Sequence, residues 1–514
     1  MESAPSGNGT TLPEKRKFRQ PRAEQQPSKK GRFDNKKQQK QAKKAKAKAK
    51  EGGTEEVLGI DIKNFLASHN DAEAVVENAE LPEEFSEIEL EVEELSSTGD
   101  GLALHGGRAY VVPFSIPGDR VKVKVIRHQE THSVVDFLSV VRPSPDRDDS
   151  LIGCKYFGSC SGCQLQMLSY DKQLAHKKRV VEKAYEHFAD LPEGILPPIG
   201  DTIGSPLQYN YRTKLTPHFD GPRKGGFQGD QKPEIGFNLK GQRRVLDIED
   251  CPIGVDSVRE GFTTSRADVL NNLGKYKRGA TLLLRESTKR IPDSEDLSTF
   301  TEKKLCITDP KATTTEYVDN FKFDSPAGAF FQNNNSILPT FTAYIRDNLS
   351  LPVSSQAESN TEPPKYLVDA YCGSGLFTVT CGSAVQKAIG VDISPDSIAY
   401  ATRNAKENGI TNATFIAGTA EKIFGDIDFP GSKASCIIDP PRKGCDELFL
   451  EQLMVFKPKR IVYVSCNVHT QARDLEYILK HETGQKYKVD SIRGFDFFPQ
   501  THHVESVAVL TLAD

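Results

Sequence analysis

The chain has 514 residues, of which 37% are hydrophobic and 27% are charged, and its net charge is -4. This length predicts about three domains, and the low hydrophobic share predicts that part of the chain stays outside any core. No apolar run of about 18 residues exists, which excludes a membrane-spanning helix. The N-terminus is polar and lacks the pattern of a secretory signal. The ten cysteines are therefore expected to be free thiols or metal ligands rather than a disulfide framework.

The charge is unevenly distributed along the chain. Residues 1–50 hold 16 Lys and Arg against 4 Asp and Glu, a net of +12, and residues 51–100 hold 16 acidic residues against one lysine, a net of -15. A basic segment of low complexity predicts a disordered tail over residues 1–55. Its charge indicates a polyanionic partner, most simply nucleic acid, with a solvated solubility tail as the alternative. Residues 56–84 are predicted to be an acidic linker that contains one helix.

Short alternating strands are predicted from residue 85 to residue 143. Ile88, Leu90 and Val92 alternate with glutamates, and glycine-containing turns separate the apolar runs that follow. Such spacing predicts a small β-barrel. Four basic side chains suit a surface that follows a nucleic-acid backbone, namely Lys122, Lys124, Arg127 and Arg142. Alternating strands also require a solvent-facing polar half, which is the other interpretation of these residues.

A cysteine array lies in residues 144–329, which we predict to be a central α+β domain. Cys154, Cys160 and Cys163 have the spacing C-x5-C-x2-C, and Cys251 follows much later. Four thiolates can bind an iron–sulfur cluster or a tetrahedral zinc ion. Ordinary thiols are the alternative.

Two further features of this central segment lead to predictions. The apolar spacing over Asp171–Phe188 predicts a helix with Lys177, Lys178 and Arg179 exposed. Aromatic and basic residues are interleaved from Leu207 to Lys214, which suits base stacking and phosphate contact with RNA. An ordinary sheet surface is the alternative for that stretch.

The segment 330–514 alternates between strand and helix patterns, which predicts a doubly wound α/β sheet. A polar stretch, 354–364, is predicted to be a surface loop. The predicted strands are Tyr366–Tyr371, Lys387–Asp392, Ala413–Ala417, Ala434–Asp439, Arg460–Ser465 and Val507–Leu512.

A glycine turn follows the first of these strands. Gly373 and Gly375 let the backbone approach a ligand closely, and Asp392 ends the next strand, where it can accept hydrogen bonds from ribose hydroxyls. Thr378 stands where the nicotinamide fingerprint has its third glycine. This departure favours S-adenosylmethionine over a nicotinamide cofactor.

Two chemistries remain open at the next motif, Asp439-Pro-Pro-Arg442, whose prolines stiffen the turn after a strand. One is methylation of a base amine and the other is methylation of a pyrimidine carbon. Cys466 directly follows a buried strand, and its thiolate could add to C6 of uracil, which makes C5 nucleophilic. Glu505, at the start of the last apolar strand, could then remove the C5 proton. Methylation of an amine needs neither group.

Several motifs together resemble the RNA uracil-5-methyltransferase family, in the family's order, over residues 85–514. In the barrel segment, the motifs resemble a TRAM domain: Gly99-Asp-Gly101, Val112-Pro-Phe and Pro117-Gly-Asp-Arg-Val-Lys-Val. In the C-terminal segment, the matching motifs are Phe330-Phe-Gln332, Asp369-x-Tyr-Cys-Gly-x-Gly375, Asp439-Pro-Pro-Arg-x-Gly444, Val464-Ser-Cys-Asn467 and Pro499-x-Thr-x-His-x-Glu505.

The resemblance implies a fold class and a set of site residues. The fold is α/β: a C-terminal doubly wound, Rossmann-like S-adenosylmethionine-dependent methyltransferase domain, a central α+β domain and an N-terminal OB-like TRAM β-barrel. Cys466 is implied as the nucleophile and Glu505 as the proton acceptor, with Asp439 also catalytic. The implied S-adenosylmethionine contacts are Gln332, Tyr371, Gly373, Gly375, Asp392 and Asp439. A further family position falls on Leu376, which can offer only backbone or apolar contact. The array Cys154, Cys160, Cys163 and Cys251 matches the family members that carry a [4Fe–4S] cluster.

The resemblance also implies a substrate. The basic tail and the stretch 354–364 resemble a fungal form of the family that methylates C5 of a T-loop uridine in tRNA, at position 54. We expect a monomer without membrane association, in the nucleus, the cytoplasm or both, with a mitochondrial pool left open. The alternatives are a base-amine methyltransferase acting on RNA and a non-catalytic RNA-binding or RNA-folding protein.

Deletion of residues 1–55 is expected to weaken RNA binding, and to do so mainly at low salt, because exposed lysines act by releasing counterions from the phosphate backbone. The measurement is the dissociation constant for tRNA over a series of salt concentrations, for the full chain and the truncated one. Equal salt slopes for the two proteins would contradict this role of the tail.

Overall fold

The structure is a computed structural model, which describes residues 52–69, 81–222, 227, 231–292, 299–350, 364–418 and 423–513. These residues belong to one compact unit, 51–514. The predictions for the basic tail and for nearly all of the polar stretch 354–364 lie outside the described residues. Within the described part, no helix is long and apolar enough to cross a membrane.

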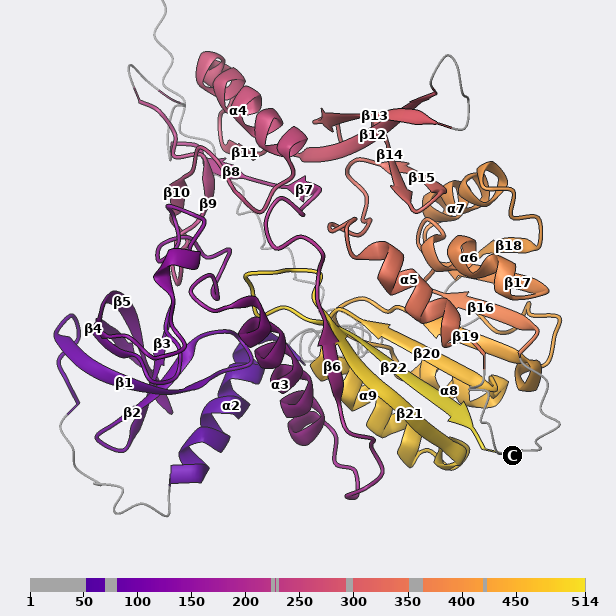
Figure 1. Ribbon diagram of the computed structural model, residues 1–514, viewed down its shortest axis with the longest axis horizontal. Helices are drawn as coiled ribbons and strands as arrows, with labels where there is room; N and C mark the ends of the chain where they lie inside the picture. The colour runs from indigo at the N-terminus through magenta and orange to yellow at the C-terminus, as the bar shows by residue number, and fades with distance from the viewer. Residues whose placement is uncertain are drawn as a thin grey trace, which may run out of the picture. The chain divides into compact units, whose positions relative to one another are not determined.

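Five strands near the N-terminus close into a barrel in the order β1-β2-β3-β5-β4 (Figure 1). The strands are β1 (Glu87–Leu95), β2 (Gly101–His105), β3 (Arg108–Val112), β4 (Arg120–His128) and β5 (His132–Arg142). Leu90, Val92 and Val123 are buried in its interior, as their alternation with charged residues predicts. The prediction of an OB-like barrel is confirmed.

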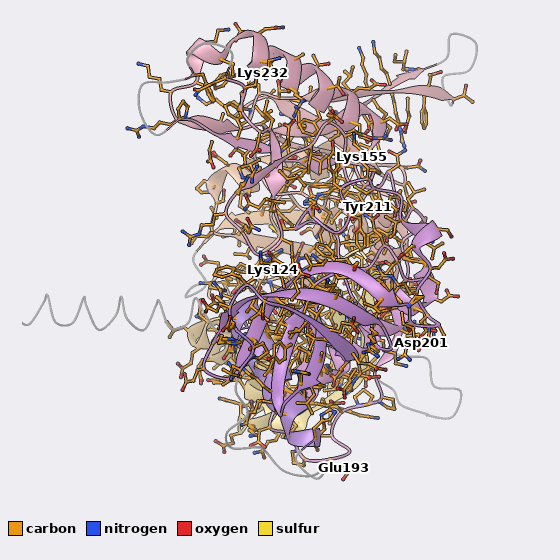
Figure 2. All side chains as sticks on the ribbon, turned by 90° about the vertical axis from the view of Figure 1, so that its left-hand side faces the viewer. Lys124, Lys155, Glu193, Asp201, Tyr211 and Lys232 are labelled. Carbon is orange, nitrogen blue, oxygen red and sulfur yellow. The ribbon has the colours of Figure 1, made fainter. Side chains whose placement is uncertain are left out.

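Two of the four basic residues predicted for the surface of this barrel form ion pairs with acidic neighbours. Lys122 pairs with Glu87 at 2.7 Å, and Arg142 pairs with Glu91 at 2.9 Å. Lys124 lies over the ring of the exposed Phe85 on the barrel (Figure 2). The glutamates that alternate along β1 therefore face the same solvent as the lysines and arginines of β4 and β5.

One helix, α2 (Thr54–His69), packs on the outside of the barrel. Ile62 and Phe65 form a small core with Leu102, Ala109 and Val111. The buried carboxylate of Asp61 accepts a hydrogen bond from the Ser97 amide at 2.5 Å. The predicted acidic helix thus ends at His69 in the structure, and residues 70–80 are not among those described.

The C-terminal half forms an eight-stranded sheet in the order β18-β17-β16-β19-β20-β22-β21-β6. Its strands are β16 (Tyr366–Ala370), β17 (Lys387–Asp392), β18 (Ala413–Ala417), β19 (Ala434–Ile438), β20 (Arg460–Ser465), β21 (Tyr487–Phe495) and β22 (Glu505–Leu512), with β6 (Gly200–Ile203) at one edge. The strands β16 to β20 are parallel, and β22 runs antiparallel between β20 and β21. All six predicted strands are present, whereas β21 and β6 were not predicted.

Helices cover both faces of this sheet, as a doubly wound fold requires. One face packs against α3 (Tyr170–Phe188), α8 (Glu447–Phe456) and α9 (Val468–Lys480). The other packs against α5 (Leu338–Asp347), α6 (Leu376–Cys381) and α7 (Pro395–Glu407). Because α3 and β6 come from the segment predicted as the central domain, that segment completes the sheet of the C-terminal half.

Among the described residues, the remaining central elements are α4 (Asp256–Asn271), which packs against β12 (Leu284–Pro292) and β13 (Phe300–Ile307), and three small antiparallel sheets. Besides these two strands, the sheets contain β7 (Lys214–Leu215), β8 (His218–Asp220), β9 (Gly236–Asn238), β10 (Val245–Asp247), β11 (Gly279–Thr281), β14 (Thr313–Val318) and β15 (Phe321–Pro326).

One prediction for the central segment is wrong, and one interpretation left open there is excluded for a single residue. Lys177, predicted to be exposed on α3, is fully buried and forms an ion pair with Asp496. Tyr211 (labelled in Figure 2) belongs to the stretch for which base stacking and an ordinary sheet surface were both left open. It is 1% exposed and donates a hydrogen bond to the carbonyl of Pro499, so it is not available for stacking on RNA bases. Both side chains belong to the scaffold that joins the central segment to the C-terminal sheet.

Candidate active site

A cavity of about 820 Å³ opens at the carboxyl ends of the parallel strands. This is the edge at which doubly wound sheets bind ligands, and the volume is within the usual range for ligand pockets. Most of the predicted site residues line it, namely Gln332, Tyr371, Gly373, Leu376, Asp392, Asp439, Cys466 and Glu505. The structure therefore brings together residues that are up to 173 positions apart in the chain.

The pairing of β20 with β22 sets the two reactive side chains opposite each other. In this antiparallel pair Ser465 is the partner of Ser506, so the next position along the ladder juxtaposes Cys466 and Glu505. Directly opposed residues of an antiparallel pair lie within side-chain contact distance. The thiol and the carboxyl group are thus neighbours at the edge of the cavity.

The turn after β16 has an unusual backbone. Tyr371 has a positive φ of 63°, which is uncommon for a non-glycine residue and occurs where the surroundings impose it. Gly373 follows with a φ of 54° and lines the cavity. Gly375 does not line the cavity. It precedes α6 with a φ of 89°, and a Cβ there would approach Ala401 to 3.1 Å. Gly375 therefore allows α6 and α7 to pack closely, and its predicted contact with a cofactor stays a prediction.

Carboxylates hold this turn in place. Asp392 accepts hydrogen bonds from the amides of Gly373 at 3.1 Å and Ser394 at 2.8 Å. Asp369 accepts hydrogen bonds from both the amide and the hydroxyl of Thr378. A threonine thus stands at the position of the third glycine because its hydroxyl satisfies a buried carboxylate.

Three acidic groups share one side of the cavity. Burial raises the pKa of Glu505 to about 7, and the positive charge of Arg442 opposes the rise. Burial also raises the pKa of Cys466 to about 12, and the charges of Glu505 and Asp439 add to that rise. The pKa of Asp439 is raised by burial and by the charge of Glu505. A carboxyl group with a pKa near 7 is matched to proton transfer at neutral pH, and the crowded acids favour a cationic ligand.

Arg442 and Asn467 also contribute to the site, although neither was predicted as a site residue. Arg442 lines the cavity and its charge acts on both Cys466 and Glu505. The side-chain amide of Asn467 donates to the backbone carbonyl of Arg442 at 2.8 Å and to that of Gly52 at 3.1 Å. Both residues lie within motifs that the sequence shares with the family, and this position was the only signal in the sequence that could have indicated a role in the site. The charge interaction itself needs the fold.

Exposed apolar groups mark the mouth of the same cavity. Phe330 is 76% exposed and Ile393 is 72% exposed, and both line the cavity. They offer apolar contacts to a ligand that enters the cavity.

The four predicted cluster ligands are free thiols whose charges act on one another. Burial raises the pKa of Cys251, and the charges of Cys163, Cys160 and Cys154 add to the rise. Over the residues that the structure describes, no group of three or more His, Cys, Asp or Glu side chains is arranged to hold a metal ion. The four thiols are therefore electrostatically coupled without forming a site for a single ion.

Comparisons with known proteins show which family of proteins the chain is similar to. The model of the tRNA (uracil-5-)-methyltransferase family matches residues 318–512, and that of the TRAM domain matches residues 82–132. A tRNA (uracil(54)-C(5))-methyltransferase of Schizosaccharomyces pombe is 51% identical, over 91% of this chain and 85% of that protein. The chain belongs to the tRNA (uracil-5-)-methyltransferase family. An enzyme of the same name from Saccharomyces cerevisiae is 44% identical, over 82% of this chain and 73% of that protein.

A solved structure supports the fold of this methyltransferase. The tRNA (uracil-54, C5)-methyltransferase of Pyrococcus abyssi, solved with S-adenosyl-L-homocysteine, superposes with a TM-score of 0.57 at 22% identity, over 82% of this chain and all of that one. The predicted family, fold class and enzyme class are confirmed. The roles predicted for individual residues stay predictions.

Replacement of Glu505 by Gln is expected to stabilise this methyltransferase at pH 8. The pKa of the folded carboxyl is raised from its usual 4.5 to about 7, so the folded state binds more protons than the unfolded state between these values. Stability is then lost as pH rises through that window, by on the order of 3 kcal/mol. The midpoints of thermal unfolding of both proteins, measured from pH 4 to pH 8, check this.

The control for that measurement is Glu482→Gln, which removes the same charge at an exposed position. The difference between Glu505→Gln and the parent chain should shrink toward zero at the acid end. A difference that does not depend on pH, or a destabilised Glu505→Gln at pH 8, would contradict the raised pKa.

Proposed function

We propose that this enzyme transfers a methyl group from S-adenosylmethionine to C5 of the uridine at position 54 of tRNA. The observation that carries the proposal is the β20–β22 register, which sets Cys466 opposite Glu505 beside a cavity. Methylation of a pyrimidine carbon needs a nucleophile and a base next to each other. The names of the two yeast relatives support this substrate.

Each residue of the pair has a defined task in this mechanism. The Cys466 sulfur, as thiolate, forms a bond to C6 of uracil, and the electron pair of the C5–C6 double bond becomes available at C5. After C5 has taken the methyl group, Glu505 removes the C5 proton. The double bond then re-forms, the bond between sulfur and C6 breaks, and the thiolate is regenerated. Arg442 favours the ionised forms of both groups.

The side of the cavity that is formed by the glycine turn is suited to hold S-adenosylmethionine. This cofactor supplies a methyl group on a positively charged sulfur. Asp392 keeps its carboxylate at the cavity wall through two backbone amides, where it can accept hydrogen bonds from ribose hydroxyls. Gln332 and Tyr371 line the same wall. Asp439, whose buried carboxyl lies near Glu505 and Cys466, meets the positive end of the ligand.

Replacement of Cys466 by Ala is expected to lower turnover on tRNA by at least about 1000-fold and to abolish any covalent RNA adduct, because the nucleophile is lost. Replacement of Glu505 by Gln should instead trap a methylated adduct, because the C5 proton stays in place. Denaturing gels with radiolabelled S-adenosylmethionine and tRNA distinguish the two outcomes. Cys306→Ala, at a half-buried thiol outside the cavity lining, is the control.

The competing function is methylation of a base amine, which the Asp439-Pro-Pro-Arg442 loop would also permit. It requires neither the thiol nor the carboxyl group. Unchanged turnover of Cys466→Ala would therefore favour that function over ours. Nucleoside analysis of the product, with the methyl group on nitrogen rather than on C5, would identify it.

We also propose that Cys154, Cys160, Cys163 and Cys251 bind a [4Fe–4S] cluster. Support comes from the donor set, four free thiols that are coupled to one another. Residues 210–212 bond to the backbone of Pro252 and Ile253, so a cluster there would stiffen the segment that carries Tyr211.

Protein purified without oxygen is expected to contain about four iron and four sulfide ions per chain. Cys160→Ser should lose both, and Cys306→Ser should keep both. Elemental analysis and a sulfide assay measure this directly. One zinc ion without sulfide, or no metal at all, would contradict the cluster.

We further propose a monomeric enzyme of the nucleus, the cytoplasm or both.

A further inference from the structure

The connection between β21 and β22 begins and ends at the predicted base. Phe495, the last residue of β21, is the pairing partner of Glu505, the first residue of β22. The connection 496–504 therefore leaves the sheet beside Glu505 and returns directly into it. A shift of this connection can therefore be passed directly to the carboxyl group of Glu505.

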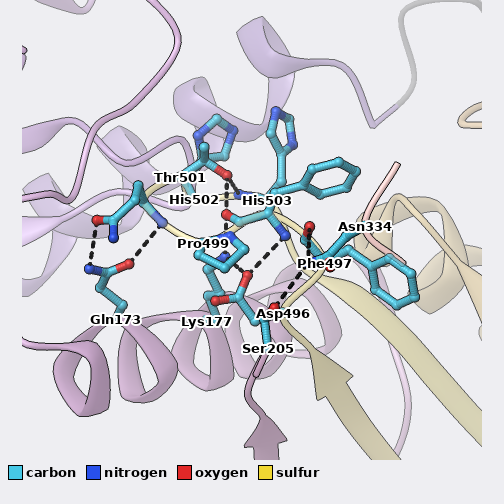
Figure 3. A network of polar contacts seen from close by, with 12 residues as sticks. Gln173, Lys177, Ser205, Asn334, Asp496, Phe497, Pro499, Thr501, His502 and His503 are labelled. Carbon is cyan, nitrogen blue, oxygen red and sulfur yellow. Dashed lines mark hydrogen bonds and ion pairs between the residues drawn. The ribbon is translucent and has the colours of Figure 1, made fainter. Parts of the chain in front are cut away.

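A buried ion pair from helix α3 holds the start of the connection (Figure 3). The Lys177 ammonium pairs with Asp496, and both side chains are fully buried. The same ammonium donates to the carbonyl of Phe498 at 2.9 Å. Asp496 in addition accepts hydrogen bonds from the Tyr170 hydroxyl and the Phe498 amide, each at 3.0 Å. The two charges are thus paired, and both oxygens of Asp496 accept hydrogen bonds.

Two reciprocal hydrogen bonds between Gln173 of the same helix and Gln500 hold the middle of the connection. The Gln173 side-chain amide donates to the side-chain carbonyl of Gln500 at 3.0 Å. The backbone amide of Gln500 donates back to the side-chain carbonyl of Gln173 at 2.9 Å. Figure 3 shows Gln173 and Lys177 on one helix, both facing the connection. One rigid element therefore holds the connection at two points.

Other segments secure the remaining backbone groups. Tyr211 donates to the carbonyl of Pro499 at 3.1 Å, and Asn334 donates to that of Phe497 at 3.1 Å. The carbonyl of Gln500 accepts the amides of Gln164 and Leu165. A loop with so many specific polar partners is held in one conformation, which is what a precisely placed base requires.

A buried ion pair is an inefficient way to stabilise a fold. Desolvation of the two charges consumes much of their attraction, and apolar residues of similar volume often stabilise a protein as well or better. What the charged pair provides is direction, because the ammonium must meet specific oxygens of Asp496 and Phe498. This favours a role in placing the connection over a role in stability alone.

We propose that Lys177 and Asp496, with Gln173 and Gln500, are positioning residues that place Glu505 for removal of the C5 proton. The inference rests on the proposed function, because it assumes that Glu505 is the base. It predicts a defect in one step: the covalent adduct forms and is methylated, but its release is slow. Binding of tRNA and of S-adenosylmethionine should change little, because none of the four residues lines the cavity.

The test is a single-turnover experiment with the full chain, tRNA and radiolabelled S-adenosylmethionine. Lys177→Met and Gln173→Ala are each expected to accumulate the methylated RNA adduct, with release of product slowed about 10- to 100-fold, the cost of a displaced catalytic group. The KM values should stay near those of the parent enzyme. A fold that is merely weakened would lower adduct formation and product release together, so the ratio of adduct to product separates the two roles.

Two further variants complete the design. Asp119→Asn breaks another buried ion pair, with Arg147 in the barrel region, and should release product normally. The neutral double variant Lys177→Gln/Asp496→Asn keeps hydrogen-bonding groups without buried charge, and it should release product faster than Lys177→Met. Should Lys177→Met fail to fold, this double variant and Gln173→Ala decide.

Product release at the parent rate in Gln173→Ala and the Lys177 variants would overturn the inference. So would equal loss of adduct and product in all of them. The same experiment with Glu505→Gln distinguishes failure of the positioning role from failure of the proposed function. If Glu505→Gln traps the adduct and the α3 variants do not, only the positioning role is wrong. If Glu505→Gln traps nothing, the proposed mechanism is wrong as well.

Discussion

The antiparallel pairing of β22 with β20 is the constraint on which the site depends. A doubly wound sheet of parallel strands collects side chains at one edge, but each comes from the end of its own strand. Because β22 enters the sheet in the opposite direction, its first residue lies beside the end of β20. A carboxyl group thereby comes next to a thiol that follows a different strand. The shift of one residue in this register would turn Glu505 to the other face.

Burial and charge together give the cavity its chemical character. Burial raises the pKa of Glu505, Cys466 and Asp439, and the charge of Glu505 raises the pKa of the other two further. The charge of Arg442 opposes the rise for Glu505 and Cys466. Such an arrangement costs stability while the cavity is empty, as expected of functional sites. It also explains why a positively charged methyl donor is a suitable ligand. The same groups that destabilise the empty site become favourable partners when a cation is bound.

The central segment contributes more to the active site than its position in the chain indicates. Helix α3 packs beside α9 and reaches the β21–β22 connection through Lys177 and Gln173 (Figure 3). The prediction of an exposed Lys177 was wrong, and Tyr211 is not available for base stacking, for the same reason. A lysine or tyrosine in an amphipathic pattern is assigned to solvent by default, and only a partner distant in sequence, here Asp496 or Pro499, can satisfy it in the interior.

The sequence by itself determined the barrel, six strands of the large sheet and the glycine turn, and it predicted Cys466 and Glu505 as the reactive pair, because periodicity and motif spacing are local. It did not reveal β21, β6 or the two scaffold side chains. Those depend on pairing between segments about 290 to 320 residues apart, such as β6 with β21 and Lys177 with Asp496. Cys466 and Glu505 could be recognised one by one, but their meeting is decided by strand register. That register is set by packing both faces of the sheet, which no local pattern contains.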